Sequence, residues 1–404
     1  MLDNGKAEGV RKIKRFEKYC LKDIATVSQG FTFSRLYQGK KNLKWNYFKV
    51  ADIGLNPNSK YLTNAINTIS DITMEEIGAL PFSKGSIVFP RVGAALFNNN
   101  KKILAQDGVV DDNVLVLTVT DTSKCWYEFL YYYLQGIPLA KWCNSGLVPV
   151  INTKTVLSQM VFLPPLPEQQ KIAAILSTQD KVIELKEKLL AQKQQQKKYL
   201  MQQLLTGKKR LPGFDRKWNY VKANEIFKSI VDKSYDGKLE VLSSTQDKGI
   251  VPRSQVDIDI KYNENSLSTY KKVSEGDFVI SLRSFQGGIE YSNYAGIVSP
   301  AYTVLRAIVK IDAGYYKQFF KSSNYIKRLN VAVYGIRDGK QISYDDFGQI
   351  RIPVPPIEEQ REVAKVLSTA DHEIDLLQKS IDAEKQKKKA LMQLLLTGKV
   401  RVKI

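Results

Sequence analysis

The clearest hydrophobic pattern in the chain lies near its C-terminal end. Apolar residues recur there at alternating spacings of four and three positions, and eight of ten such positions are apolar. This spacing places them on one stripe of a helix, as in a coiled-coil seam. The pattern therefore predicts a long helix that offers one face to a partner. The ten positions are Val363, Leu367, Ala370, Ile374, Leu377, Ile381, Glu384, Lys388, Leu391 and Leu395.

An earlier stretch of the chain repeats this one without a gap. Residues 165–210 match residues 356–401 at 23 of 46 positions, including LST-x-D and LMQ-x-LLTGK. Prolines stand before both stretches and stop the preceding segments. Glu168 and Glu359 fall in the first turn, where the helix dipole favours acids. Gly207 and Gly398 stand where glycines commonly end helices. The repeat therefore predicts two helices of similar length.

The first copy has the weaker seam, because four of its ten seam positions are polar. This favours pairing of the two helices with each other over two independent coiled coils. The alternative is two unrelated amphipathic helices, each packed only on its own domain. The residues expected at the helix–helix interface are Leu176, Ile183, Leu190, Leu204, Leu367, Ile374, Ile381 and Leu395.

Two other segments, before and after the first helix, are of similar size and share faint similarity. KGSIVFPR (84–91) and EGDFVISLR (275–283) each combine a glycine turn, an apolar strand and a terminal arginine. Aromatic stretches follow in both segments and are typical of buried helices. We therefore expect an α+β protein with an internal repeat. Its parts would be a first domain at 1–164 with a basic tail at 1–16, a helix at 165–211, a second domain at 212–355 and a helix at 356–404.

Charge adds a partner to this picture. The chain has 61 Lys and Arg against 41 Asp and Glu, which gives a net charge of +20. Both globular segments are basic, and such an excess favours a polyanion as the partner. No apolar run is long enough to span a membrane, and the charged N-terminus does not resemble a secretory signal. We therefore expect no membrane partner and a cytoplasmic location.

Catalytic chemistry is sparse in this sequence. His372 is the only histidine, and its charged, helical surroundings are typical of a solvated position. The three cysteines form no CxxC pair, which fits a reducing cytosol and gives no thiolate zinc site. None of the Gly-Lys pairs lies in a GxxxxGK[ST] phosphate loop. We expect no catalytic residue, no metal and no cofactor in this chain.

The Pro-Pro-x-x-Glu-Gln helix starts, LST-x-D and the LLTGK ends resemble the specificity (S) subunits of type I restriction–modification enzymes. So does the order of domain, helix, domain, helix along the whole chain. The resemblance implies two α/β-type target recognition domains, each reading one half of a bipartite site in double-stranded DNA. It also implies that two long antiparallel helices, related by a pseudo-twofold, separate these domains. Because the domains differ in sequence, we expect the site to be asymmetric.

The resemblance also implies partner proteins. Two methyltransferase (modification) subunits would carry S-adenosylmethionine and adenine methylation. Restriction (motor) subunits would add cleavage that uses ATP and Mg, so this chain would be a non-catalytic subunit. One alternative is a specificity module of a methylation-only or fused methyltransferase–nuclease system. Another is a non-DNA helical scaffold, which would lack DNA affinity with a steep salt dependence.

Candidate DNA contacts rest on position and residue type, because no base-contacting residue follows from the resemblance. Loop Arg, Lys, Asn and Gln suit phosphates and purine edges. The candidates are Arg91 and Arg283 at the ends of the matching strands, Asn98, Lys101 and Lys102 in an expected loop, Asn152 and Lys154 in the matching stretch of the first domain, Gln286 before two glycines, and Arg337, Lys340 and Gln341 around a glycine.

Overall fold

The chain divides into two compact units. A computed structural model describes residues 16–55, 59–144, 146, 148–234, 237–256, 264–332 and 342–404. Unit 1 consists of residues 1–188 and 379–404, and unit 2 consists of residues 189–378. Each unit therefore holds one globular domain and parts of both long helices. The expected basic tail at 1–16 lies almost entirely outside the described residues.

The two long helices occupy the repeated stretches of sequence. They are α5 (Leu166–Leu204) and α10 (Ile357–Leu395), each of 39 residues. At 1.5 Å per residue, each is about 58 Å long. Gly207 (φ 68°) and Gly398 (φ 71°) follow them in the left-handed conformation, which a residue with a side chain adopts only with strain. The glycines predicted to end the helices therefore do so.

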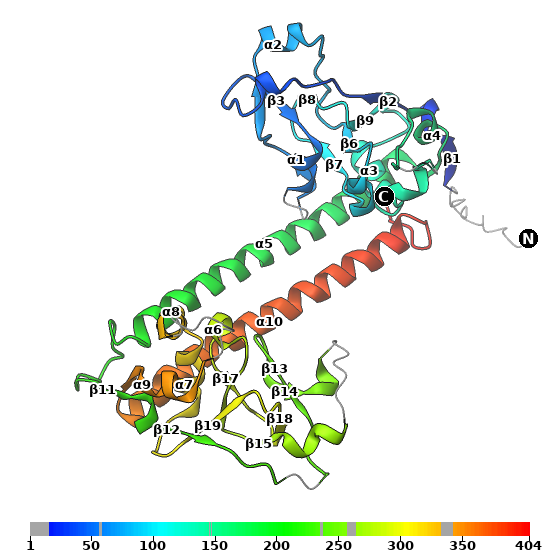
Figure 1. The fold of residues 1–404 in the computed structure, drawn as a ribbon. Coiled ribbons are helices and arrows are strands. Elements are labelled where there is room, and N and C mark those ends of the chain that lie inside the picture. The colour runs from blue at the N-terminus through cyan, green and yellow to red at the C-terminus, as the bar shows by residue number, and fades with distance from the viewer. Residues whose placement is uncertain are drawn as a thin grey trace, which may run out of the picture. The chain divides into compact units, whose positions relative to one another are not determined.

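Within each unit the two helices lie antiparallel (Figure 1). Their polar contacts show this direction. Residues nearer the end of α5 contact residues nearer the start of α10. The α5 residues in these contacts are the four polar seam positions noted in the sequence. They are Gln179 and Lys186, which bind Glu384 at 2.7 and 2.8 Å in unit 1, and Lys193 and Lys197, which bind Glu373 at 2.7 Å and Asp371 in unit 2.

Apolar packing joins both helices to the globular domain of each unit. Leu176 and Leu395 belong to the core of unit 1, and Leu204 and Leu367 belong to that of unit 2. The helices thus pack on the domains and on each other, so the alternative of helices that pack only on their own domains is wrong. Further along the seam, Ile183 and Ile381 are buried, and Leu190 and Ile374 are half-buried.

The domain of unit 1 is built on a five-stranded sheet in the order β2-β9-β6-β7-β4. A three-stranded sheet, β5-β3-β8, and the pair β1-β10 complete it. Its strands are β1 (Glu17–Cys20), β2 (Ala25–Gln29), β3 (Trp45–Phe48), β4 (Tyr61–Leu62), β5 (Asn67–Ile69), β6 (Ile87–Pro90), β7 (Lys102–Leu104), β8 (Val109–Val110), β9 (Val114–Val119) and β10 (Met160–Leu163). Its short α-helices are α1 (Val50–Gly54), α2 (Asp71–Glu76), α3 (Tyr127–Gln135) and α4 (Thr153–Leu157).

The domain of unit 2 contains a four-stranded sheet in the order β12-β19-β16-β17, with the pairs β11-β20, β13-β14 and β15-β18. Its strands are β11 (Asn219–Lys222), β12 (Phe227–Ile230), β13 (Leu242–Thr245), β14 (Gly249–Pro252), β15 (Lys271–Val273), β16 (Phe278–Ile280), β17 (Glu290–Tyr291), β18 (Gly296–Val298), β19 (Thr303–Ala307) and β20 (Arg351–Val354). Its short α-helices are α6 (Ser284–Gly287), α7 (Ala313–Phe320), α8 (Ser323–Ala332) and α9 (Tyr344–Gln349).

The two domains share an antiparallel core plan. The strand triplet β2-β9-β6 of unit 1 corresponds to β12-β19-β16 of unit 2. The matching sequence segments KGSIVFPR and EGDFVISLR form β6 and β16, which hold equivalent places. The aromatic stretches form α3 and α7 and bury most of their rings in the cores, as their spacing predicts. These features confirm an α+β fold with an internal repeat.

The Glu-Gln pair that begins each long helix has a structural role. Glu168 accepts hydrogen bonds of 2.7 and 2.5 Å from Arg401, which lies just beyond the end of α10. Glu359 accepts bonds of 2.6 and 2.6 Å from Arg210, which lies just beyond the end of α5. Both carboxylates are buried, and the start of each helix is therefore tied to the end of the other copy. The adjacent Gln169 donates to the carbonyls of Lys124 and Pro164, at 2.7 and 2.8 Å.

Candidate nucleic-acid interface

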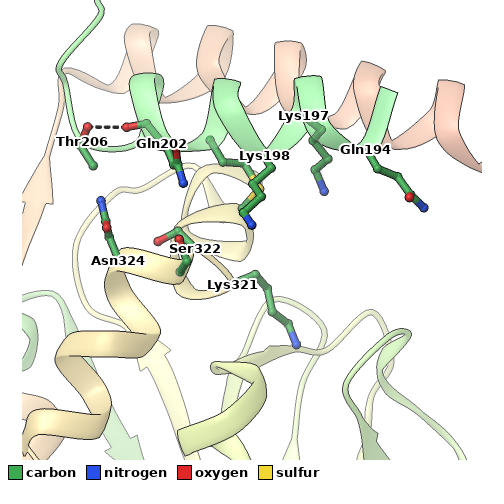
Figure 2. A pocket seen from close by; sticks show the side chains of 10 residues that line it. Gln194, Lys197, Lys198, Gln202, Thr206, Lys321, Ser322 and Asn324 are labelled. Atoms are coloured by element: carbon green, nitrogen blue, oxygen red, sulfur yellow. Dashed lines mark hydrogen bonds between the residues drawn. The ribbon is translucent and has the colours of Figure 1, made fainter. Parts of the chain in front are cut away.

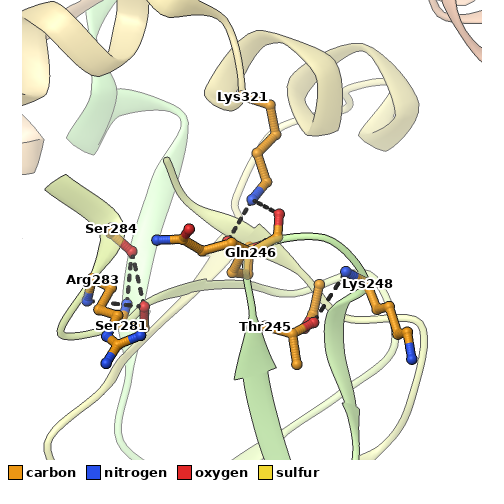
Figure 3. Close-up of polar contacts among 9 residues, drawn as sticks. Thr245, Gln246, Lys248, Ser281, Arg283, Ser284 and Lys321 are labelled. Carbon is orange, nitrogen blue, oxygen red and sulfur yellow. Dashed lines mark hydrogen bonds and ion pairs between the residues drawn. The ribbon is translucent and has the colours of Figure 1, made fainter. Parts of the chain in front are cut away.

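A polar groove of about 640 Å³ lies in the domain of unit 2. Loop 245–248, between β13 and β14, lines it together with the segment that follows β16. We call it the unit 2 groove and define it by Thr245, Gln246, Lys248, Ser281, Arg283 and Tyr302. These hydroxyl, amide and cationic groups are the donors and acceptors that read base edges. Figure 3 shows most of them.

The backbone on both sides of this groove is held by short local hydrogen bonds. Thr245 Oγ1 accepts from the Lys248 amide at 3.0 Å and donates to the Gly249 carbonyl at 3.0 Å. On the other side, Ser281 N donates to Ser284 Oγ at 2.8 Å, and Arg283 N donates to Ser281 Oγ at 3.4 Å (Figure 3). These bonds hold the main chain on both sides of the groove, while Gln246, Lys248 and Arg283 are exposed.

Arg283, a predicted contact residue, lies in this groove with its side chain exposed. Within the part of the chain that the structure describes, its guanidinium has no hydrogen-bond or ion-pair partner. Arg306 of the same domain differs, because the buried Asp277 carboxylate accepts two bonds of 2.7 Å from it. Arg283 therefore keeps all its side-chain donors for a ligand.

Gln286, also predicted, lies exposed on α6, and the two glycines after it lie close to other segments of the domain. A Cβ on Gly287 would lie 2.9 Å from Gln246 Cγ, and one on Gly288 would lie 2.1 Å from the Phe320 carbonyl oxygen. The two glycines after Gln286 therefore leave room for a close neighbour, as their lack of a side chain allows. They admit the close approach of other segments of the same domain.

Lys321 links loop 245–248 to the domain core. Its Nζ donates to the Gln246 carbonyl at 3.1 Å and pairs with Glu290, which is 2% exposed. Burial raises the pKa of Glu290 despite this lysine. Lys321 also lines a second groove of about 270 Å³, beside the C-terminal part of α5. Figure 2 shows its side chain pointing away from α5.

In unit 1 the corresponding strand end carries Arg91. Its amide donates to the Asn113 carbonyl at 2.8 Å, and its carbonyl accepts from the Ile151 amide at 2.9 Å. Its Nη1 donates to the Asp112 carbonyl at 3.4 Å. Two separately predicted residues, Arg91 and Asn152, are thus brought together, because Asn152 follows Ile151 directly. Asn152 is exposed, and so is Lys154 on α4.

The other predicted contacts of unit 1 are placed differently. Asn98 is exposed at the end of a 3₁₀ turn, but Lys101 and Lys102 are each only 2% exposed. Lys101 Nζ donates to Asn99 Oδ1 at 2.6 Å and to the Ile137 carbonyl at 2.9 Å, and Lys102 Nζ donates to the Ser59 carbonyl. Burial lowers the pKa of Lys101 to about 7 and that of Lys102 to about 8. The expectation of an exposed loop at both lysines is therefore wrong.

Three predicted contacts, Arg337, Lys340 and Gln341, lie outside the described residues. Sequence reasoning missed loop 245–248, Tyr302 and Lys321. The signal that could have identified the loop is STQDKG (244–249), a run of polar residues ending in glycine between two apolar stretches. Nothing local marks Lys321, because its role depends on a partner 31 residues away.

Two broader features of the described residues bear on function. No helix among them is both long and apolar enough to cross a membrane. That part of the chain also holds no group of three His, Cys, Asp or Glu side chains that could bind a metal ion.

Comparison with known proteins identifies the family. The family model for the "Type I restriction modification DNA specificity domain" matches residues 13–194 and 215–385. The chain is 25% identical, over 95% of its length and 93% of the relative, to the "Putative type I restriction enzyme MjaX specificity subunit" of Methanocaldococcus jannaschii. It is 28% identical to the type I restriction enzyme MjaVIII specificity subunit of the same organism, over 63% of this chain and 65% of that one.

Solved structures show the same fold. The S subunit of a type I restriction–modification system from M. genitalium aligns with a TM-score of 0.58 and 14% identity, over 96% of this chain and 98% of that one. A chain from a structure of the type I R-M system aligns with a TM-score of 0.57 and 16% identity, over 96% and 98%. The chain belongs to the family of type I restriction–modification DNA specificity subunits, which confirms the resemblance seen in its sequence.

Proposed function

We propose that this chain recognises an asymmetric, bipartite site in double-stranded DNA, and that each unit reads one half. The observation that carries the proposal is the pair of unlike polar sets at equivalent strand ends. Unit 2 offers Arg283, Gln246 and hydroxyl groups around a groove. Unit 1 offers Arg91 beside Asp112 and Asn152. Different donors and acceptors on a shared scaffold would select different base pairs.

The chain itself would supply no chemistry in this proposal. Two modification subunits would bind S-adenosylmethionine and methylate the site, and restriction subunits would use ATP and Mg. The family of the chain and its net charge of +20 support a role in DNA targeting. Since DNA is the substrate, we propose the cytoplasm as the place of action. The domain limits proposed for exchange experiments are 1–164 and 212–355, with the helical segments 165–211 and 356–404 between and after them.

The test uses the chain together with its modification subunits in cells that lack other adenine methylation. Sequencing of methylated DNA should give a motif of two unlike halves. Replacing residues 1–164 with the corresponding domain of a relative should change one half and leave the other intact. A motif with one part, or a replacement that alters both halves, would contradict separate reading by the two units.

The salt dependence of DNA affinity distinguishes DNA binding from the scaffold alternative. A DNA-binding chain should lose affinity steeply as salt rises, with a slope of log K against log salt of about −0.9 for each phosphate contact. A scaffold that meets DNA only by chance should show weak binding and no sequence preference. The methylation-only alternative makes the same DNA contacts and differs only in the absence of cleavage by the complete complex.

A further inference from the structure

Arg283 combines a fixed backbone with a free side chain. Its amide donates to Ser281 Oγ, and its carbonyl accepts from the amides of Gln286 and Gly287 at 2.9 and 3.2 Å. Its guanidinium has no partner among the residues that the structure describes. A long donor that starts from a rigid base is suited to specific recognition, because little ordering is left for the moment of binding.

The surroundings of Arg283 favour a base edge over a phosphate. Asp247 also lines the unit 2 groove. Its negative charge offsets the positive charge of the neighbouring Lys248, and its carboxylate can accept a hydrogen bond from the cytosine amino group, a donor that a phosphate lacks. Arginine binds guanine O6 and N7 with two parallel bonds, which is the commonest specific contact in the major groove. Arginine and aspartate in one groove thus match the two bases of a G·C pair.

The two sides of the groove are in contact with each other. The Gln246 side chain lies against the backbone of Gly287, only a few residues from Arg283. Lys321 holds the Gln246 carbonyl and is itself paired with the buried Glu290 (Figure 3). Without Lys321, loop 245–248 would lose its link to this buried carboxylate and keep only its local hydrogen bonds, so Gln246 and Asp247 would be held less firmly.

We infer that Arg283 reads a guanine in the half-site of unit 2, and that Lys321 is a positioning residue that holds loop 245–248 beside it. This inference rests on the proposed function and adds the residue and the base to it. Because unit 1 reads the other half-site, that half-site is an internal control within each variant.

The test is methylated-motif sequencing with the chain and its modification subunits. Arg283→Lys keeps the positive charge but removes the two parallel N–H donors of the guanidinium group. The preference for guanine at one position of the unit 2 half-site should fall by about 5- to 150-fold. The unit 1 half-site should keep its sequence. The matched control is Arg351→Lys, an exposed arginine on β20 outside the groove, which should leave the whole motif unchanged.

Lys321→Met should relax base preference in the unit 2 half-site, and Lys321→Arg should restore it at least in part. A merely structural role would lower the overall level of methylation without changing the motif. The inference is overturned if the wild-type half-site of unit 2 contains no G·C pair, or if Arg283→Lys and Arg283→Met leave its preferences unchanged. Failure of the proposed function looks different, because the wild-type complex would then give no two-part motif at all.

Discussion

The ion pair between Arg401 and Glu168 allows a quantitative test of how much the contact between these two helix ends stabilises unit 1. Arg401 donates to both carboxylate oxygens, at 2.7 and 2.5 Å, and the Val402 amide donates to the same carboxylate at 3.2 Å. The Glu168 side chain is only 2% exposed. Changing Arg401 to Met would keep much of the side-chain volume and remove the countercharge. Glu168 would then be a buried carboxylate with a backbone amide as its remaining donor.

Removing one partner of a buried ion pair typically costs about 3–5 kcal/mol. At about 1.4 kcal/mol for each factor of ten, this corresponds to a hundredfold or greater loss in the equilibrium constant for folding of unit 1. Arg401→Lys keeps the charge but loses the paired geometry, so its cost should be smaller, about 1.5–3 kcal/mol. In the double variant of Glu168→Gln with Arg401→Met no charge is left unpaired, and it should be more stable than Arg401→Met alone.

Two measurements on the purified full chain check this prediction. Denaturant unfolding gives the free energy, and hydrogen exchange of the C-terminal peptide gives the local opening near Val402. Arg210→Met is the matched variant in unit 2, and its loss should be smaller because the Trp218 indole N–H still donates to Glu359 at 2.8 Å. An unfolding free energy for Arg401→Met within about 0.5 kcal/mol of wild type, with unchanged exchange, would refute the reasoning.

Three further predictions concern the seam, a glycine and acid. Leu176→Asp should destabilise unit 1 by several kcal/mol, about as much as other buried unpaired charges, whereas Leu185→Asp, at a position 53% exposed, should be nearly neutral in thermal melting. Gly288→Ala should cost more than Gly276→Ala in unfolding free energy, because both have positive φ but only Gly288 faces a backbone carbonyl oxygen, 2.1 Å from the added Cβ. Hydrogen bonds lower the pKa of Glu384 to about 2. The contribution of Glu384 to folding stability is therefore present above its unfolded pKa of about 4.3 and is lost as the pH falls towards 2. Glu384→Gln should flatten the fall in stability over that range, and an unchanged acid profile would exclude this contribution.

The long helices were predictable because their signals are local. A seam with a period near 3.6, prolines at the start and a glycine at the end all act within a few residues of one another. The four polar seam positions of α5 looked like weaknesses in the sequence alone. They become ion pairs and hydrogen bonds only because acidic residues of α10, 174 to 205 positions later in the chain, lie opposite them.

The domains were less predictable because their contacts are distant in sequence. Lys101 and Lys102 follow three asparagines and read as an exposed loop. Their burial is possible because carbonyl oxygens 36 and 43 positions away accept hydrogen bonds from their ammonium groups. The strand order β2-β9-β6 likewise joins segments that no local pattern connects. Arg283 lies just after β16, near the strand end where the sequence placed it, because that place is a local feature, and its contact with DNA stays a prediction.

The contacts at the helix ends couple the two repeats to each other. Each unit combines the start of one copy with the end of the other, so Glu168 needs the arginine of the second copy and Glu359 needs the arginine of the first. A change at either position must be compatible with a partner encoded in the other repeat. Gln360 forms the same kind of bond to the Pro355 carbonyl as Gln169 forms to that of Pro164. Among the described residues, the hydrogen bonds that hold loop 245–248 and Arg283 lie within their own domain, so changes there do not have to match a partner in the other repeat.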